Sequence, residues 1–221
     1  QGGEASKMRS RIFFDPMQDP VMEKAARWGE RWVLVSFAGR VHVVDASGDE
    51  LRFEEPWLLT ELPQAEDSWR VGGLHPVAVH AASGRLYCLM HRGPSVSHKD
   101  AGSEVWVYDL EARERIQRIR LKSPGLTVMG QSREFGRGWI WPFRGLYDAL
   151  LRLLPEPGVQ SIQVTQDEAP LLLTGGQMAG SLALYDALDG DFAGRVLTGN
   201  FTTHALLTPG DRKSTRLNSS H

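Results

Sequence analysis

Short runs of β-branched and aromatic residues recur along the chain, separated by segments rich in Gly, Ser, Pro and Asp. The clearest group has four runs, at 75–80, 85–91, 104–109 and 115–121. Each run is alternating or fully apolar, as expected for antiparallel strands that are covered on one or both faces. Four short strands within about 45 residues are typical of one propeller blade. The pattern therefore predicts a four-stranded blade between His75 and Leu121.

The same pattern precedes and follows this blade. Further strands are predicted at 31–37, 40–45, 51–53, 161–164, 171–174, 181–186 and 193–197, and 203–207 would open another blade. Three runs end in an aspartate directly before a short turn: Asp45, Asp109 and Asp186. Such an aspartate can accept hydrogen bonds from the following backbone amides and close the hairpin as an Asx-turn. The aspartates are 64 and 77 residues apart, and this irregular spacing favours a propeller with insertions over a strictly periodic solenoid.

Two stretches depart from the strand pattern. Residues 21–28 bring apolar side chains to helical spacing, which predicts one or two helical turns. Residues 122–159 form a long insertion in which leucines recur near helical spacing before Pro155, which predicts one short helix. We therefore expect an all-β chain with a short-helix insertion at 122–159.

The last eleven residues, 211–221, do not continue the pattern. Their sequence, DRKSTRLNSSH, equals the in-frame translation of a common DNA sequencing adapter, codon by codon. We expect the propeller region to lie within 1–210 and the tail to be no part of the fold. The tail has three basic side chains and one acidic side chain, so without its charge of +2 the formal net charge falls from −2 to −4. A mildly acidic chain does not favour nucleic-acid binding, which needs a basic face.

Composition narrows the class of protein. Hydrophobic residues make up 41% of the 221 residues and charged residues 24%, which is typical of a chain with a packed core. No apolar run approaches the roughly 18 residues that a membrane-spanning helix needs. The one cysteine, Cys88, cannot form an internal disulfide and argues against a cysteine-rich metal site. The chain begins at Gln1 without a leader, so a signal peptide, if the precursor has one, lies upstream.

The sequence predicts no self-contained catalytic, cofactor-binding or metal site. His75 and His80 lie five residues apart on either side of one predicted strand, point to opposite faces, and so disfavour a shared metal ion. The loop triplet 98–100, His-Lys-Asp, is typical of a hydrogen-bonded turn, because neighbours in sequence rarely face each other productively. Residues 130–134 lack the final glycine of a nucleophile elbow.

Aromatic residues have two predicted roles. Four tryptophans lie in or beside predicted strands: Trp32, Trp57, Trp69 and Trp106. For these, packing within or between blades is the simplest role. Four residues of the insertion have the composition of a protein interface: Trp139, Trp141, Phe143 and Arg144. We predict that these four face a partner protein, the alternative being that they fold back as a lid on the propeller.

Several motifs resemble the heavy (large) subunit of methylamine dehydrogenase and related quinoprotein amine dehydrogenases, a family of β-propellers. They are WRVGG at 69–73, HPVAVH at 75–80, RLY at 85–87, HKD at 98–100 with Gly102, EVWVYD at 104–109, VTQD at 164–167, APLL at 169–172 and LYD at 184–186. The resemblance covers most of 31–121 and 160–208.

The resemblance implies a seven-bladed propeller of four-stranded antiparallel blades, of which this chain would be about the second half. It implies a periplasmic enzyme that oxidises primary amines to an aldehyde and ammonia. In that family the heavy subunit holds a small, disulfide-dense light subunit, which carries the catalytic residues and a tryptophan tryptophylquinone made from two of its own tryptophans. A blue-copper protein or a cytochrome would accept the electrons. This chain would then be a non-catalytic scaffold in a hetero-oligomer, and its single cysteine fits a heavy subunit.

Two other functions stay open on the sequence. One is a stand-alone periplasmic propeller that acts as a binding scaffold, without a light subunit and without catalysis. The other is a propeller hydrolase with a central metal ion, whose ligands would come from blades outside this chain. A neighbouring gene for a short, cysteine-rich secreted chain would favour the amine dehydrogenase, whereas calcium-dependent activity would favour the hydrolase.

Overall fold

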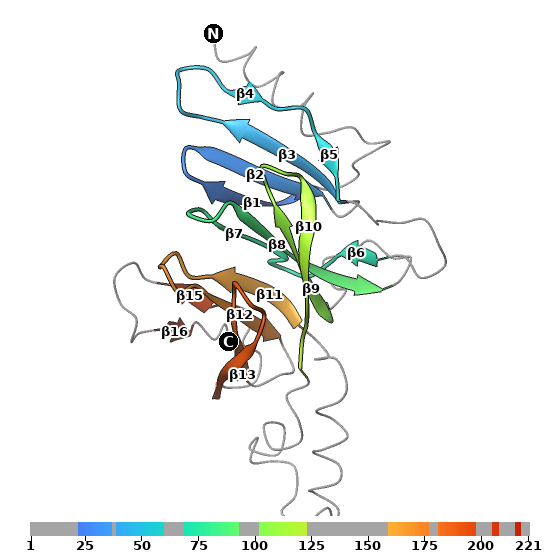
Figure 1. The fold of residues 1–221 in the computed structure, drawn as a ribbon, viewed down its shortest axis with the longest axis vertical. Helices are drawn as coiled ribbons and strands as arrows, with labels where there is room; N and C mark the ends of the chain where they lie inside the picture. The colour runs from blue at the N-terminus through green and yellow to red at the C-terminus, as the bar shows by residue number, and fades with distance from the viewer. Residues whose placement is uncertain are drawn as a thin grey trace, which may run out of the picture.

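A computed structural model describes residues 22–36, 39–59, 69–92, 102–122, 159–176, 181–197, 205–207 and 215–217. Within these ranges every regular element is a β-strand, and the predicted all-β class is confirmed. The strands form three successive antiparallel sheets, which follow one another along the long axis of the molecule (Figure 1), and one separate pair. The described residues include no helix with the length and apolarity that crossing a membrane requires.

The first sheet has five strands, in the order β1 (Met22–Trp28), β2 (Arg31–Ser36), β3 (Arg40–Asp45) and β4 (Arg52–Phe53), with β5 (Trp57–Leu58) also paired to β3. Its second to fourth strands lie where the sequence predicts them. The fifth strand is too short to have a pattern of its own, and it continues the edge that β4 begins.

The prediction of helical turns at 21–28 is wrong. Strand β1 pairs with β2 along its length, with Trp28 opposite Arg31 and Ala26 opposite Val33. The same two β1 side chains, Ala26 and Trp28, pack into the hydrophobic core that the first sheet shares with the next one. Strand pairing and burial therefore outweigh a helical spacing that spans only the eight residues 21–28.

The middle sheet confirms the four strands predicted between His75 and Leu121. It contains β6 (Trp69–Val71), β7 (Val77–His80), β8 (Arg85–Arg92), β9 (Glu104–Asp109) and β10 (Glu114–Arg120), in the order β10-β9-β8 with both β6 and β7 paired to β8. The sequence did not predict β6. Strands β6 and β7 pair with different parts of β8 and together form one edge of the sheet. Gly73, with a φ of +122°, turns the backbone between them.

The third sheet is a four-stranded meander of β11 (Val159–Val164), β12 (Leu171–Gly176), β13 (Ser181–Asp186) and β14 (Phe192–Leu197), as predicted. Strands β15 (Ala205–Leu207) and β16 (Thr215–Leu217) form a separate antiparallel pair. Strand β16 lies in the tail 211–221, which is predicted to be no part of the fold. That exclusion stays a prediction. The short helix predicted within 122–159 falls on residues that the structure does not describe.

The middle sheet is buried on both faces because its side chains alternate between two cores. On β8, Leu86, Cys88 and Met90 pack toward the first sheet, whereas Tyr87 and Leu89 pack toward the third. All five side chains have no exposed surface. Burying an apolar side chain of this size contributes about 1.5–3 kcal/mol, so face-to-face stacking is a main source of stability.

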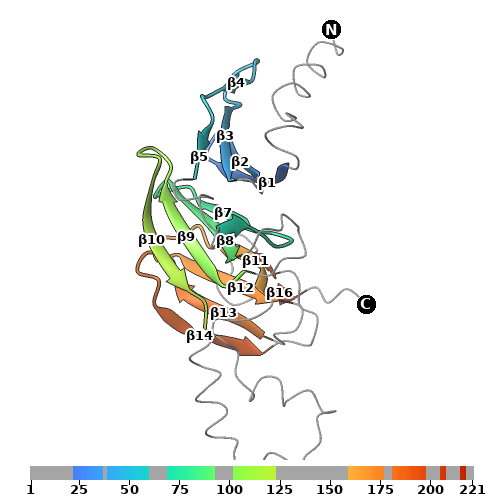
Figure 2. The ribbon, with the colours of Figure 1, turned by 90° about the vertical axis from the view of Figure 1, so that its right-hand side faces the viewer.

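Strand β7 of the middle sheet contacts both β1, the first strand of the first sheet, and β11, the first strand of the third sheet (Figure 2). Between the middle and third sheets this edge is also hydrogen-bonded through His75. Its amide donates to the carbonyl of Gln160 at 2.9 Å, and its carbonyl accepts from the amide of Ile162 at 2.9 Å. Sheets that stack face to face and bring their first strands together are consistent with consecutive propeller blades.

The three predicted Asx-turns are confirmed. Oδ1 of Asp45 accepts a hydrogen bond from the amide of Ser47 at 2.9 Å. Oδ1 of Asp109 accepts from two following amides at 2.9 and 2.8 Å, and Oδ1 of Asp186 from two at 2.7 and 3.0 Å. Strands β3, β9 and β13 thus end with the same type of turn. All of these turns lie at one end of their sheets, which we call the turn end.

Candidate functional site

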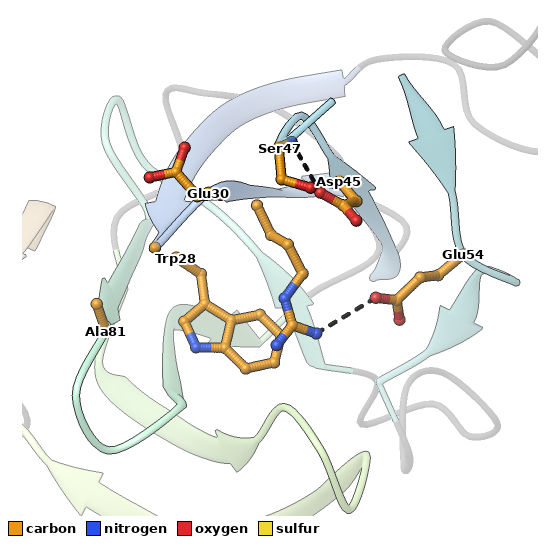
Figure 3. A pocket seen from close by; sticks show the side chains of 8 residues that line it. Trp28, Glu30, Asp45, Ser47, Glu54 and Ala81 are labelled. Carbon is orange, nitrogen blue, oxygen red and sulfur yellow. Dashed lines mark hydrogen bonds and ion pairs between the residues drawn. The ribbon is translucent and has the colours of Figure 1, made fainter. Parts of the chain in front are cut away.

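A hollow of about 490 Å³ opens where the turn ends of the first and middle sheets meet (Figure 3). Its lining comes from several turns: Trp28, Gly29, Glu30, Arg31, Asp45, Ser47, Glu54 and Ala81. Gly29 has a φ of +59°, which lets two residues connect β1 to β2. Figure 3 shows the indole of Trp28 with Ala81 on one side and Glu54 on the other.

Two arginines join the two sheets at this hollow, Arg31 and Arg113. The guanidinium carbon of Arg31 lies 3.6 Å from the centroid of the Trp28 ring, and its amino groups lie 3.4 Å from Glu54 and 3.2 Å from Glu111. Glu54 also lies 3.3 Å from Arg113. Because Arg31 and Glu54 belong to the first sheet and Glu111 and Arg113 to the middle one, these charges connect the sheets. We call these five residues the Arg31 joint.

Each carboxylate at the hollow already has a partner. Glu30 lies 3.8 Å from Arg27, and Glu54 faces two arginines. The backbone amide of Ser47, and then its hydroxyl, hold the pKa of Asp45 below its usual value. The cluster is therefore arranged to hold the sheets together and offers no carboxylate poised as a general base. Across the described ranges, no three His, Cys, Asp or Glu side chains converge as metal ligands.

The opposite end of the middle sheet carries a second charged cluster, which we call the arginine corner: Trp69, Arg92, Glu104, Trp106, Arg118 and Arg120. At its centre is the carboxylate of Glu104, whose side chain is only 8% exposed. Oε2 of Glu104 accepts hydrogen bonds from Nε1 of Trp106 at 2.9 Å and from Nε and Nη2 of Arg118 at 2.9 and 2.6 Å. Oε1 lies 3.7 Å from Nε of Arg120, whose side chain is 89% exposed.

Strand register brings these residues to one face of the sheet. Trp69 lies opposite Arg92, Glu104 opposite Arg120, and Trp106 opposite Arg118. The two indole rings have centroids 5.3 Å apart. The guanidinium carbon of Arg92 lies 5.0 Å from the Trp69 centroid, and that of Arg118 lies 5.3 Å from Trp69 and 5.0 Å from Trp106. Cation–π contact of this kind, about 0.5–1 kcal/mol each where exposed, holds the guanidinium groups in place.

The middle and third sheets are also joined by polar contacts across their packed faces. The buried hydroxyl of Tyr87 donates to the carbonyl of Ala187 at 2.9 Å, and Nη1 of Arg85 donates to the carbonyl of Leu188 at 3.0 Å. Burial raises the pKa of Tyr87 above its usual value. These contacts place the Asp186 turn of the third sheet against β8, as the Arg31 joint places the Asp109 turn against β2.

His75, His80 and Cys88 lie in different environments and do not form a common site. His75 bridges two sheets through its backbone. His80 is buried, with Nδ1 2.8 Å from Oγ of Ser83 and Nε2 3.1 Å from the carbonyl of Asp167. Cys88 is fully buried, and burial raises the pKa of its thiol. A buried thiol of this kind is unreactive.

The other predicted site residues lie outside the described ranges. These are the triplet at 98–100, residues 130–134, and the four predicted partner-facing residues Trp139, Trp141, Phe143 and Arg144. For all of them the prediction stays a prediction.

The packing role predicted for the tryptophans holds for three of the four. Trp69 and Trp106 are buried, and Trp57 packs against the same core. Trp32 is 42% exposed. The alternation of β2 explains this difference, because Val33 and Val35 face the middle sheet and Trp32 therefore faces away from it.

Sequence reasoning missed the arginines that join neighbouring sheets. Arg31 begins β2 and Arg85 begins β8, and each lies in register with the aspartate that ends the following strand, Asp45 on β3 and Asp109 on β9. Each then reaches the following sheet. An arginine that starts a strand, followed by a strand that ends in such an aspartate, is the signal that would have found them. The third sheet has Leu171 at this position.

Comparison with known proteins identifies the family to which this chain belongs. The family model "Methylamine dehydrogenase heavy chain (MADH)" matches residues 2–128. The methylamine dehydrogenase heavy chain of Paracoccus versutus is 28% identical over 162 residues, which are 73% of this chain and 30% of that protein. The heavy chain of Methylophilus methylotrophus is 24% identical over 155 residues, 70% of this chain and 30% of that protein.

Among solved structures, glutaminyl cyclase from Myxococcus xanthus aligns with 80% of this chain and 53% of its own, at 11% identity and a TM-score of 0.42, too low to support an argument. The chain spans about 30% of the length of the first two curated relatives. The family match, in contrast, covers more than half of the chain and includes the first sheet, the middle sheet and both charged clusters. The resemblance found in the sequence is thereby confirmed, and the chain belongs to the methylamine dehydrogenase heavy chain family.

Proposed function

We propose that this chain is part of the heavy subunit of a tryptophan tryptophylquinone-dependent amine dehydrogenase, which oxidises primary amines to aldehyde and ammonia. The family match over residues 2–128 is the observation that carries the proposal. In this proposal the three sheets are blades of a seven-bladed periplasmic propeller, about its second half, and a blue-copper protein or a cytochrome takes the electrons.

The role of this chain would be to hold and orient a light subunit. The stacked sheets suit a rigid scaffold, because each interface combines a buried apolar core with polar contacts between residues far apart in sequence. The carboxylates of Glu54 and Glu104, in the two charged clusters, pair with arginines rather than standing poised for proton transfer. A subunit of this kind would bind and orient its partner, and the residues that oxidise the amine would belong to the partner.

We also propose that the quinone cofactor belongs to the light subunit. The one close tryptophan pair in the described residues, Trp69 with Trp106, does not fit a cofactor precursor. Trp106 is 1% exposed, Trp69 is 9% exposed, and their rings contact the guanidinium groups of Arg92 and Arg118. Because both rings are buried and stacked against arginines, their role in this proposal is to pack the sheet.

Co-purification tests the scaffold role. The complete heavy-chain gene is expressed in a periplasm-competent host, once with its neighbouring genes and once alone, and purified through a tag on the heavy chain. We expect a small, cysteine-rich chain to co-purify in equal molar amount in the first case. A heavy chain that elutes alone under both conditions contradicts the proposal and favours the stand-alone binding scaffold.

A further inference from the structure

We propose that the arginine corner is a binding surface for a carboxylate-rich segment of a partner protein. Three guanidinium groups, those of Arg92, Arg118 and Arg120, meet only one carboxylate among the described residues, that of Glu104. The six residues of the corner therefore have a summed formal charge of +2, within a chain of formal net charge −2. A local excess of this sign on an acidic protein attracts an anionic group to one place on its surface.

Two of the three arginines keep their guanidinium groups available. Arg92 is exposed, and in the described part of the chain its charged group contacts the Trp69 ring and no carboxylate. Arg120 approaches Glu104 only at 3.7 Å and only through Nε, with 89% of its side chain exposed. Arg118, in contrast, directs both Nε and Nη2 to Oε2 of Glu104. Among the described residues the buried carboxylate is thus committed mainly to Arg118, and the other two guanidinium groups keep N–H groups that no carboxylate accepts.

The corner is also ordered in advance of binding. Arg118 lies within 5.3 Å of both indole centroids, and Arg92 lies 5.0 Å from the Trp69 centroid. A guanidinium held over an aromatic ring loses less side-chain entropy on binding than one that moves freely in solvent. A planar guanidinium offers two parallel N–H groups, which match the two oxygens of a carboxylate. Aspartate or glutamate side chains of a partner are therefore the groups that this corner fits.

An acidic protein segment fits better than a nucleic acid. A nucleic acid needs a row of cations that follows its phosphates, whereas this corner has three arginines on one face of one sheet end, on a chain that is negative overall. The inference goes beyond the proposed function, which assigns this surface no ligand. Its test measures binding only, so a negative result leaves the proposed amine dehydrogenase untouched.

Fluorescence anisotropy of a labelled octaglutamate peptide, titrated with the intact heavy chain, tests the inference. We expect binding at low salt that weakens strongly at about 300 mM NaCl, because the contacts are exposed. The double variant Arg92→Gln with Arg120→Gln should bind about tenfold more weakly, since two charge-assisted contacts are lost. The control, Arg27→Gln with Arg52→Gln on the first sheet, removes the same charge elsewhere and should bind like the wild type.

Three results would overturn the inference. They are equal affinity of the corner variant and the control variant, equal binding of an octaglutamine peptide, and tighter binding of a single-stranded oligonucleotide than of octaglutamate. Far-ultraviolet circular dichroism and the thermal midpoint show that both variants are folded. Arg120 alone, being 89% exposed, gives a second variant, Arg120→Gln, that does not threaten the fold and should weaken binding about threefold.

Discussion

Replacing Glu104 by Gln removes one negative charge from the arginine corner and keeps the shape of the side chain. Oε2 of Glu104 accepts three hydrogen bonds, one from Trp106 and two from Arg118, all at 2.6–2.9 Å. A glutamine oxygen can keep the bond from Trp106 as a neutral one. The two bonds from Arg118 still have a cationic donor but lose the attraction between opposite charges, and the new amide group faces Arg120 without attraction.

The size of the effect follows from these contacts. A hydrogen bond with a charged group contributes about 1.5–3 kcal/mol and a neutral one about 0.5–1.5, so the bond from Trp106 loses about 1 kcal/mol. The two bonds from Arg118 keep their charged donor and together lose about as much, which brings the cost to about 2 kcal/mol. Arg118 is 39% exposed and regains some hydration, which reduces the cost. We therefore expect Glu104→Gln to lower the free energy of unfolding by about 1–2 kcal/mol. Glu104→Ala should cost more, about 3 kcal/mol, because it also leaves the indole N–H of Trp106 without its acceptor.

Urea denaturation of the intact heavy chain, followed by tryptophan fluorescence, measures the change. Glu111→Gln is the matched control, because Glu111 also pairs with an arginine but is 71% exposed. Its expected cost is below about 0.5 kcal/mol. A double-mutant cycle of Glu104→Gln with Arg118→Gln should give a coupling of about 1 kcal/mol. If Glu104→Gln and Glu111→Gln have the same midpoint, the buried carboxylate does not stabilise the corner and the reasoning is refuted.

Two further substitutions test the contacts between sheets. Gly73→Ala should lower the free energy of unfolding by at least about 2 kcal/mol, because the residue has a φ of +122° and a Cβ there would lie 2.6 Å from the carbonyl oxygen of Gln160. Gly48→Ala is the control: its Cβ would meet no atom within 4 Å, so the same urea titration should show no change. Tyr87→Phe removes the hydrogen bond to Ala187 and should cost about 1 kcal/mol at neutral pH. Because burial raises the folded-state pKa of Tyr87, the wild type holds its full stability below the unfolded pKa of about 10 and loses part of it as pH rises further. The difference between wild type and Tyr87→Phe should therefore shrink in urea titrations above that pH, and a constant difference would contradict the burial argument.

Strand positions and turns were predictable because their signals are local. The alternation from Glu104 to Asp109 and the aspartates before each turn lie within a few residues of the structure they specify. Strands β5 and β6 escaped prediction because two or three residues have no period. Strand β1 was misread because its helical spacing is local, whereas its pairing and its burial against the middle sheet are not.

The charged clusters were not predictable from residue types alone. Arg31 and Glu111 are 80 residues apart in the chain and meet only because the first and middle sheets stack at their turn ends. The arginine corner depends on strand register, since a shift of one residue would move Arg118 to the other face of the sheet. The family resemblance was readable earlier because its motifs, such as the run from Glu104 to Asp109, are contiguous.

The most direct test of the proposed function is the absorption spectrum of the heavy chain purified together with its co-expressed neighbour. The account predicts a visible quinone band that resides in the small chain and bleaches when a primary amine is added, with ammonia released. An equimolar complex without a visible band, or a band that no primary amine bleaches, would contradict the proposed amine dehydrogenase and leave a propeller scaffold that binds a partner without this chemistry.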